Sequence, residues 1–237
     1  MMRCAVFGAG GGIGAAMVRA LLAREDVARV YAGSRSGAGP GDTRCIPFRF
    51  DLLDEDSIRT AAEGIAGDGP LDLVVVATGI LQDLPTVRPE RSWSATDPEA
   101  FAKVFALNAT GPAMIGKHVL PHLAKGGRFA ALSARVGSIG DNRLGGWHAY
   151  RASKAALNMI VRNFAIELRR RDAGAVAVVL HPGTVDTGLS RPFQNNVAKK
   201  TLFDADRAAS QLLSVLVGLR PADTGGFFAW DGSPIDW

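Results

Sequence analysis

The sequence predicts one α/β domain: a doubly wound parallel sheet of seven strands with helices on both faces. Short apolar runs alternate with stretches of helical periodicity along all 237 residues, an order that favours a parallel sheet whose strands are joined by helices. The runs are continuously apolar, as expected of strands covered on both faces. No repeat, low-complexity segment or linker interrupts this order, so we expect a single domain over residues 1–237.

The elements follow one another in a regular order. Seven runs have strand character, at residues 3–7, 28–32, 46–50, 73–77, 128–132, 175–180 and 226–229. Five stretches have the apolar spacing of amphipathic helices, at residues 13–24, 55–65, 98–123, 150–171 and 204–217. Right-handed crossovers between parallel strands then produce the doubly wound order. In such a fold the functional residues belong in the crevice at the carboxyl ends of the strands.

A glycine-rich turn follows the first strand and opens the first helix. Residues 8–14 read GAGGGIG, between the apolar run 4–7 and the helical pattern. Strand, glycine turn and helix are the context that a dinucleotide-binding loop requires. Glycines let the backbone approach a pyrophosphate, and the helix N-terminus supplies unpaired N–H groups. A flexible connector is the alternative, and the context favours cofactor binding.

The second strand ends in residues that bear on the choice of cofactor. Ser34 and Arg35 follow it, at the place where NAD-binding proteins often have an acid on the ribose hydroxyls. A guanidinium can pair with a 2′-phosphate, which an acid would repel. The pattern therefore favours NADP(H) and leaves NAD(H) open, with an ordinary surface arginine as the alternative.

The predicted helix 150–171 carries Tyr150 and, one turn later on the same face, Lys154. A free phenol has a pKa of about 10 and is a poor acid at neutral pH, but a neighbouring cation lowers that pKa. A phenol tuned in this way can donate a proton to a carbonyl oxygen or take one from an alcohol. The alternative is that Tyr150 and Lys154 only lie on a solvated helix face. The glycine-rich turn elsewhere in the chain favours a catalytic pair.

These motifs resemble the classical short-chain dehydrogenase/reductase family over essentially the whole chain. The family's Gly-x-x-x-Gly-x-Gly motif is matched within residues 8–14, and its Tyr-x-x-x-Lys motif by Tyr150 and Lys154. Its supporting asparagine is matched by Asn108, and its Pro-Gly stretch after the sixth strand by residues 182–187. The segments 145–151 and 227–237 look like the C-factor and sniffer-like carbonyl reductase subgroup.

The resemblance implies a Rossmann-like NAD(P)-binding fold and an oxidoreductase that moves hydride between the nicotinamide and a carbonyl or alcohol substrate. Tyr150 would be the general acid or base, and Lys154 would lower its pKa and hold the nicotinamide ribose. Asn108 would hold a water that passes protons to Lys154, with a bond to its own helix backbone as the alternative. The implied cofactor-binding residues are Gly8, Gly10, Gly11, Gly12, Ile13, Gly14, Ser34, Arg35, Asp51, Leu52, Ala77, Thr78, Gly79, Asn108, Tyr150, Lys154, Pro182, Gly183, Val185 and Thr187.

Two of these assignments meet competing interpretations. Asp51 and Leu52 follow the third strand, where the family holds adenine, but Asp51 is also suited to starting the next helix. The usual catalytic serine is replaced by Ala134, which leaves Ser133 as the assigned donor, through a local shift, and Ser138 as the other candidate. Losing one such donor typically costs ~10²–10³ in rate. Ala134 therefore favours a second function, a cofactor-binding regulatory or signalling protein with weak or no catalysis.

Composition narrows the partners and the location. The formal charge of +4 comes from dispersed basic residues, and the cluster at 169–171 closes a helix, where cations favour the dipole, so no nucleic acid is expected. No apolar run is long enough for a membrane span, and no room remains for a signal peptide before the first strand. Cys4 and Cys45 are expected to be reduced core thiols, consistent with the cytoplasm.

The substrate and the oligomeric state are less constrained. Loops 81–94 and 190–200 are expected to shape the pocket, with Trp147, Leu189 and Phe193 as apolar walls or as core. His118 and His122 have helical spacing but no third ligand, so no metal is expected. By resemblance the chain forms a homodimer or homotetramer through helices 98–123 and 150–171. The apolar face of the latter is then either an interface or core, and its residues are Leu157, Ile160, Val161 and Phe164.

Overall fold

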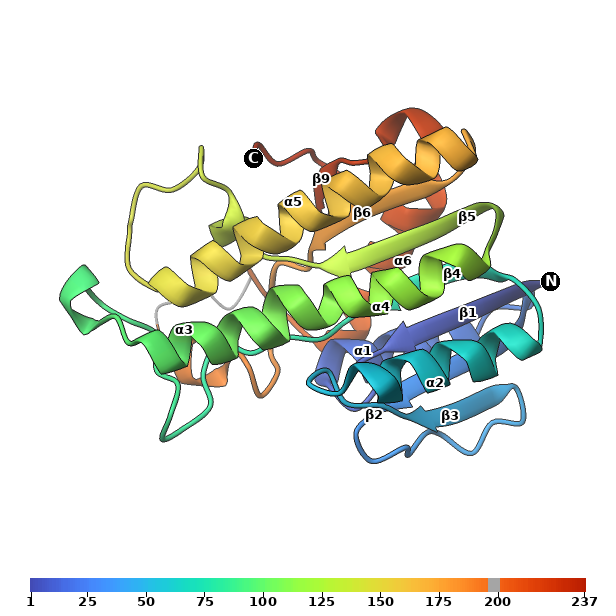
Figure 1. The fold of residues 1–237 in the computed structure, drawn as a ribbon, viewed down its shortest axis with the longest axis horizontal. Helices are drawn as coiled ribbons and strands as arrows, with labels where there is room; N and C mark the ends of the chain where they lie inside the picture. The colour runs from blue at the N-terminus through green and yellow to red at the C-terminus, as the bar shows by residue number, and fades with distance from the viewer. Residues whose placement is uncertain (196–200) are drawn as a thin grey trace.

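The computed structural model describes residues 1–195 and 201–237 and contains the predicted doubly wound sheet. Its seven strands are parallel and lie in the order β3-β2-β1-β4-β5-β6-β9 (Figure 1). They are β1 (Met2–Phe7), β2 (Val27–Ser34), β3 (Cys45–Arg49), β4 (Leu71–Val76), β5 (Leu123–Leu132), β6 (Val176–His181) and β9 (Phe227–Ala229). The chain reverses its direction of winding between β1 and β4, which places a crevice at their carboxyl ends.

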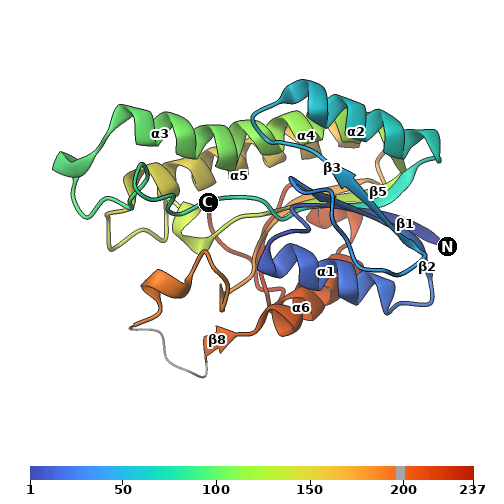
Figure 2. The ribbon, with the colours of Figure 1, turned by 90° about the horizontal axis from the view of Figure 1, so that it is seen from below.

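Helices cover both faces of the sheet, as predicted (Figure 2). The longer helices are α1 (Gly12–Leu22), α2 (Glu55–Gly67), α3 (Pro98–Phe105), α4 (Gly111–Val119), α5 (His148–Arg171) and α6 (Ala205–Gly218). Successive side chains of β1 point to opposite faces. Val6 packs in the layer of α1 and α6, and Phe7 packs in the layer of α2, α4 and α5. Two apolar cores therefore hold the central strands and fix where their carboxyl ends lie.

Helix α5 buries its apolar face within the monomer. Leu157 and Val161 are almost fully buried, and Phe164 lies against Gly116 of α4. For these three residues the structure supports core packing rather than an exposed interface. Ile160 is partly exposed.

The predicted helix 98–123 is interrupted, which corrects the sequence expectation. Helix α3 passes into a π-helical segment, Ala106–Thr110, before α4 begins, and a 3₁₀ turn, Leu120–His122, closes it. The wider turn carries Asn108, whose side chain reaches across to the backbone of Ile80. A π segment is a single wide turn inside an otherwise α-helical stretch, which is too short for periodicity alone to reveal.

Short elements near the loops were also not predicted. Strands β7 (Thr184–Val185) and β8 (Leu202–Phe203) form a small parallel pair of their own. Two-residue strands lie below the length at which alternation or apolar runs can be recognised. The predicted loop 190–200 contains a 3₁₀ turn, Arg191–Phe193, and its residues 196–200 lie outside the described part of the chain.

Candidate active site

The glycine turn packs its backbone directly against neighbouring strands. The N–H groups of Gly8 and Ala9 both donate to Gly33 O, at 2.9 and 2.8 Å. Gly8 has φ of +102°, and a Cβ there would lie 2.7 Å from Ala77 O. A Cβ on Gly14 would collide with Gly8 O. Only glycine fits at these two positions, so the turn presents bare backbone at the crevice.

The N-terminus of α1 is suited to hold an anion. Its N-cap is Gly11, which has no capping side chain, and its first turn has no acidic residue. In the described residues no acceptor lies on the N–H groups of Gly12, Ile13 and Gly14. A Cβ on Gly12 would lie 2.7 Å from Thr187 Cγ2. The chain therefore surrounds a small space with unpaired donors, and a phosphate group fits such a cradle.

The end of β2 lies beside the glycine turn and is followed by an exposed cation. Ser34 is buried and accepts a hydrogen bond from Gly37 N at 3.1 Å, and a Cβ on Gly10 would lie 3.4 Å from Ser34 Cβ. Arg35 is exposed, and among the residues that the structure describes it has no acidic partner. The guanidinium is therefore available to an added phosphate.

The residues after β3 and β4 also border the crevice. Asp51 is exposed and accepts from Leu53 N at 2.9 Å, whereas Asp54 caps α2 by accepting from Ser57 N. The interpretation of Asp51 as the start of the helix is therefore wrong. Leu52 packs against Gly111, and Thr78 Oγ1 is buried with no hydrogen-bond partner in the described chain.

Three predicted catalytic side chains converge at the carboxyl end of β5. Lys154 Nζ donates to Leu132 O at 2.9 Å and lies 5.9 Å from the centroid of the Tyr150 ring. Both residues are buried. A Cβ on Gly79 would lie 3.3 Å from Lys154 Nζ and 3.1 Å from Asn108 Oδ1. A loop after β4, the π segment and α5 thus meet at one point.

Asn108 holds this junction together through its side chain. Its Nδ2 donates to Ile80 O at 2.8 Å and to Ser153 Oγ at 3.1 Å, and its Oδ1 accepts from Ile80 N at 2.7 Å. Ser153 Oγ in turn donates to Tyr150 O at 2.8 Å. The amide is fully buried and fully used, so it bonds the neighbouring loop and helix rather than its own helix backbone.

Burial shifts the pKa of both members of the pair. It raises the pKa of Tyr150 to about 12, and the lowering of this pKa by Lys154 stays a prediction. Burial also lowers the pKa of Lys154 to about 8. Desolvation disfavours the charged form of each group, which accounts for both shifts. The phenol is therefore protonated at neutral pH.

The serines near Ala134 point into the protein. Ser133 Oγ donates to Asn158 Oδ1 at 2.6 Å, and both residues are buried. Ser138 is also buried, and its Oγ accepts from Asp141 N at 3.1 Å. The assignment of Ser133 as a substrate donor stays a prediction, because it requires this hydroxyl to leave Asn158.

Two polar residues of this junction were missed by sequence reasoning. Ser153 and Asn158 both lie on α5 and are almost completely buried. Asn158 is one turn beyond Lys154, as Lys154 is beyond Tyr150, so the four-residue spacing was a usable signal.

Aromatic rings stand beside the phenol. Trp147 meets Tyr150 edge to face at 6.2 Å between ring centroids, and Phe193 meets Trp147 at 5.3 Å. This contact joins the segment 187–195 to the start of α5, and the role of Trp147 and Phe193 as walls of a substrate pocket stays a prediction. His118 lies elsewhere on α4 and contacts Glu55 at 3.0 Å. In residues 1–195 and 201–237 no group of three or more possible ligands is arranged to hold a metal.

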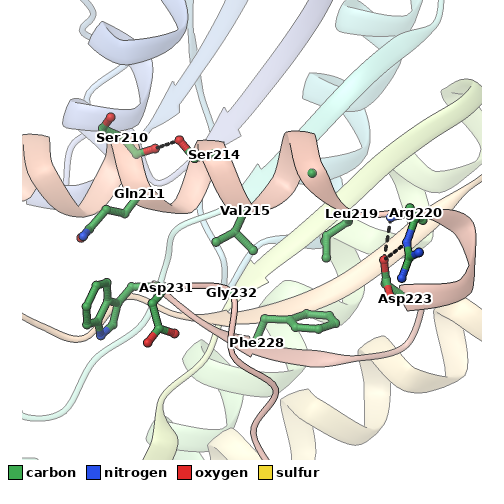
Figure 3. Close-up of a pocket in the computed structure, with 12 residues that line it drawn as sticks. Ser210, Gln211, Ser214, Val215, Leu219, Arg220, Asp223, Phe228, Asp231 and Gly232 are labelled. Atoms are coloured by element: carbon green, nitrogen blue, oxygen red, sulfur yellow. Dashed lines mark hydrogen bonds and ion pairs between the residues drawn. The ribbon is translucent and has the colours of Figure 1, made fainter.

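A separate cleft of about 650 Å³ lies between α6 and the segment after β9 (Figure 3). Its walls include Gln211 and Val215 from the helix and Phe228 and Asp231 from the opposite side. None of its lining residues is among the predicted site residues. The candidate active site is therefore defined by converging side chains and bare backbone rather than by this cleft.

The two cysteines lie in the core, as predicted. Cys4 and Cys45 are both buried and free. No described helix combines the length and the apolarity needed to cross a bilayer.

Comparison with known proteins places this arrangement among relatives. The family model described as short chain dehydrogenase matches residues 3–198. C-signal from Myxococcus xanthus is 34% identical over 174 residues, which are 71% of this chain and 94% of C-signal. An NADPH-bound carbonyl reductase from chicken fatty liver superposes with a TM-score of 0.86 at 25% identity, over 100% of this chain and 94% of that chain. The carbonyl reductase Sniffer of D. melanogaster superposes equally well, with a TM-score of 0.86 at 22% identity over 100% of both chains, a likeness of fold.

Proposed function

The chain belongs to the short chain dehydrogenase family, and we propose that it is an NADPH-dependent oxidoreductase that reduces a carbonyl compound to an alcohol. The match to C-signal supports the predicted C-factor subgroup, and the likeness to Sniffer is one of fold. One observation carries the proposal: Tyr150, Lys154 and Asn108 meet at the carboxyl edge of the sheet, where the bare glycine turn also lies. The arrangement combines a buried proton donor with a cradle for a dinucleotide.

The residues present fit the cofactor. The unpaired N–H groups of residues 12–14 would hold the pyrophosphate, and Arg35 would pair with the 2′-phosphate. By family resemblance Asp51 and Leu52 would hold adenine, and Val185 and Thr187 would lie toward the nicotinamide and phosphates. When bound, NADPH supplies the hydride. The chicken carbonyl reductase is described as NADPH-bound, which supports NADP(H), and NAD(H) is the weaker alternative.

The protein's own part in the reaction is to deliver a proton. The Tyr150 phenol is buried and protonated at neutral pH, so it can donate to the carbonyl oxygen of the substrate, and Lys154 would lower its pKa for that step. Lys154 stands close enough to stabilise the phenolate that remains and would hold the nicotinamide ribose. Asn108 fixes the loop around Ile80 against α5, and by resemblance its neighbourhood holds the water that returns protons to Lys154.

A second candidate function rests on a specific observation. Ala134 stands where the family has its second serine, and Ser133 is bonded to Asn158. Weaker polarisation of a substrate carbonyl favours a cofactor-binding regulatory or signalling protein. The name of the relative C-signal also indicates signalling. The two functions differ in turnover, which is directly measurable.

The proposal is tested by NADPH oxidation with a panel of aliphatic and aromatic aldehydes and ketones. We expect Tyr150→Phe to lower kcat by ~10²–10⁴ while leaving the dissociation constant for NADPH within about twofold. The chain has only one other tyrosine, Tyr31, so Tyr31→Phe is a matched control that keeps activity. A folded wild-type protein that binds NADPH but reduces no carbonyl compound would favour the regulatory function.

Assembly and location follow from the family in the same way. We propose a homodimer or homotetramer in the cytoplasm, formed through the faces of α4 and α5 that remain exposed. Met159 and Ile166 are exposed apolar residues on α5, which is the surface such pairing would cover.

A further inference from the structure

A buried acidic residue that the mechanism above does not use lies against the catalytic helix. Glu90, in the loop between β4 and α3, is only 5% exposed. Both of its carboxylate oxygens accept from Ala149 N, at 3.2 and 3.3 Å. Ala149 is the second residue of α5 and directly precedes Tyr150. No basic side chain in the described part of the chain pairs with this carboxylate.

Helix α5 has no cap of the usual kind. Its N-cap is Trp147, whose side chain accepts nothing, and its first turn has no acidic residue. A capping side chain normally accepts from the second or third N–H of a helix. Glu90 does this from a different segment, 59 residues away. A carboxylate at this end is also favoured by the helix dipole.

Glu90 also stabilises an unusual backbone conformation at Trp147. Trp147 has φ of +51°, in the left-handed region that bulky residues rarely adopt. Its N–H donates to Glu90 O at 2.6 Å. The Trp147 ring thereby stands beside Tyr150 and Phe193. A left-handed tryptophan persists only where the surroundings hold it there, and Glu90 provides both a main-chain and a side-chain anchor at this turn.

Apolar packing ties the loop to the same place. Val87 is buried in a small cluster with Ala100 and Val104 of α3 and with Ala149 of α5. Lys103 of α3 pairs with Asp83 at the start of the loop. The loop is therefore a packed support for the first turn of α5.

We propose that Glu90 is a positioning residue, whose carboxylate holds the first turn of α5 by accepting the Ala149 N–H and so places the Tyr150 phenol for proton transfer. This inference rests on the proposed function for its catalytic consequence. Its structural part, that Glu90 sets the position of Tyr150, can be tested without measuring turnover.

The test compares Glu90→Ala and Glu90→Gln with Asp97→Ala. Asp97 caps α3 by accepting from Ala100 N at 2.7 Å, so its variant loses an equivalent cap on a different helix. A displacement of about 1 Å can cost ~10² in rate. We expect Glu90→Ala to lower kcat by about 10- to 100-fold, with the NADPH dissociation constant within about twofold. Glu90→Gln should recover most of kcat, because its amide oxygen still accepts, and Asp97→Ala should keep kcat.

Equal kcat in Glu90→Ala and Asp97→Ala, or a Glu90→Gln variant as slow as Glu90→Ala, would overturn the proposal. Glu90→Asp, whose shorter side chain withdraws the acceptor, replaces Glu90→Ala if that variant does not fold.

The chain has two tyrosines, so ¹³Cζ-tyrosine NMR shows two signals, and Tyr150→Phe assigns them. If the wild-type protein reduces no carbonyl compound, the proposed function fails, and this spectrum alone tests whether Glu90 positions Tyr150. The Tyr150 signal should move in Glu90→Ala and stay in Asp97→Ala, and an unmoved signal would contradict the inference.

Discussion

At the residue scale, Lys154 is a cation held where water cannot stabilise it. Burial lowers its pKa from 10.5 to about 8, and its Nζ donates a hydrogen bond to Leu132 O. The buried charge of Lys154 lowers the stability of the folded protein, and the neutral phenol of Tyr150 does not compensate for it. The energetic penalty is consistent with a residue kept for chemistry rather than for stability.

This cost has a pH dependence of definite sign. Between pH 8 and 10.5 the unfolded chain holds the lysine proton and the folded protein has released it, so stability rises with pH in that window. Relative to Lys154→Met, the free energy of unfolding of the wild-type protein should therefore increase by up to about 3 kcal/mol from pH 7 to pH 10.5. Urea unfolding at several pH values measures this difference. A difference that stays constant would show that Lys154 is not desolvated.

Arg35 is the residue on which the choice between the two nicotinamide cofactors depends. Arg35 is exposed directly after Ser34, whose Cβ lies near Gly10 of the glycine turn, and it has no acidic partner in the described chain. Arg35→Ala should weaken NADPH binding by about 10- to 100-fold, because a charged hydrogen bond to phosphate is lost, and leave NADH binding within about twofold. Titration calorimetry measures both. Arg59→Ala removes a surface arginine on α2 as the control, and equal NADPH affinity in the two variants would refute the assignment.

At the scale of elements, the π segment is what brings Asn108 to the site. The side chain makes three hydrogen bonds, two to Ile80 and one to Ser153. Asn108→Ala leaves backbone groups of Ile80 without partners, so it should lower the free energy of unfolding by about 2–3 kcal/mol and reduce kcat as well. Asn163→Ala, at an exposed position of α5, should stay within about 0.5 kcal/mol of the wild-type protein. Denaturant unfolding gives both values, and a loss in Asn108→Ala no larger than in the control would contradict the role.

The elements that sequence reasoning found are those with long, uniform patterns. The last four residues of β1, β4 and β5 and the first five of β6 are buried, and these are the stretches that are unbroken apolar runs in the sequence. The π segment was missed because one wide turn is too short a change to be recognised in the apolar periodicity of the whole stretch. The start of α5 was placed two residues late, because Trp147 has no capping side chain and the cap comes from Glu90.

At the scale of the whole molecule, topology explains why the predicted site residues meet. Parallel strands place their carboxyl ends at one edge, so the glycine turn, Gly79 and Leu132 O lie there together, and α5 delivers Tyr150 and Lys154 to the same edge. This much follows from motifs and strand order. The direction of the Ser133 hydroxyl and the burial of Glu90 do not, since both depend on side-chain packing between distant segments.

The central claim is that this molecule transfers hydride from NADPH to a carbonyl carbon with Tyr150 as the proton donor. Deuterium transfer from NADPH carrying deuterium at C4 to an aromatic aldehyde, followed by mass spectrometry of the alcohol, tests it most directly. We predict labelled alcohol with the wild-type protein and with Tyr31→Phe, and almost none with Tyr150→Phe. Unreacted aldehyde with folded, NADPH-bound wild-type protein, or equal labelling by Tyr150→Phe, would contradict the account.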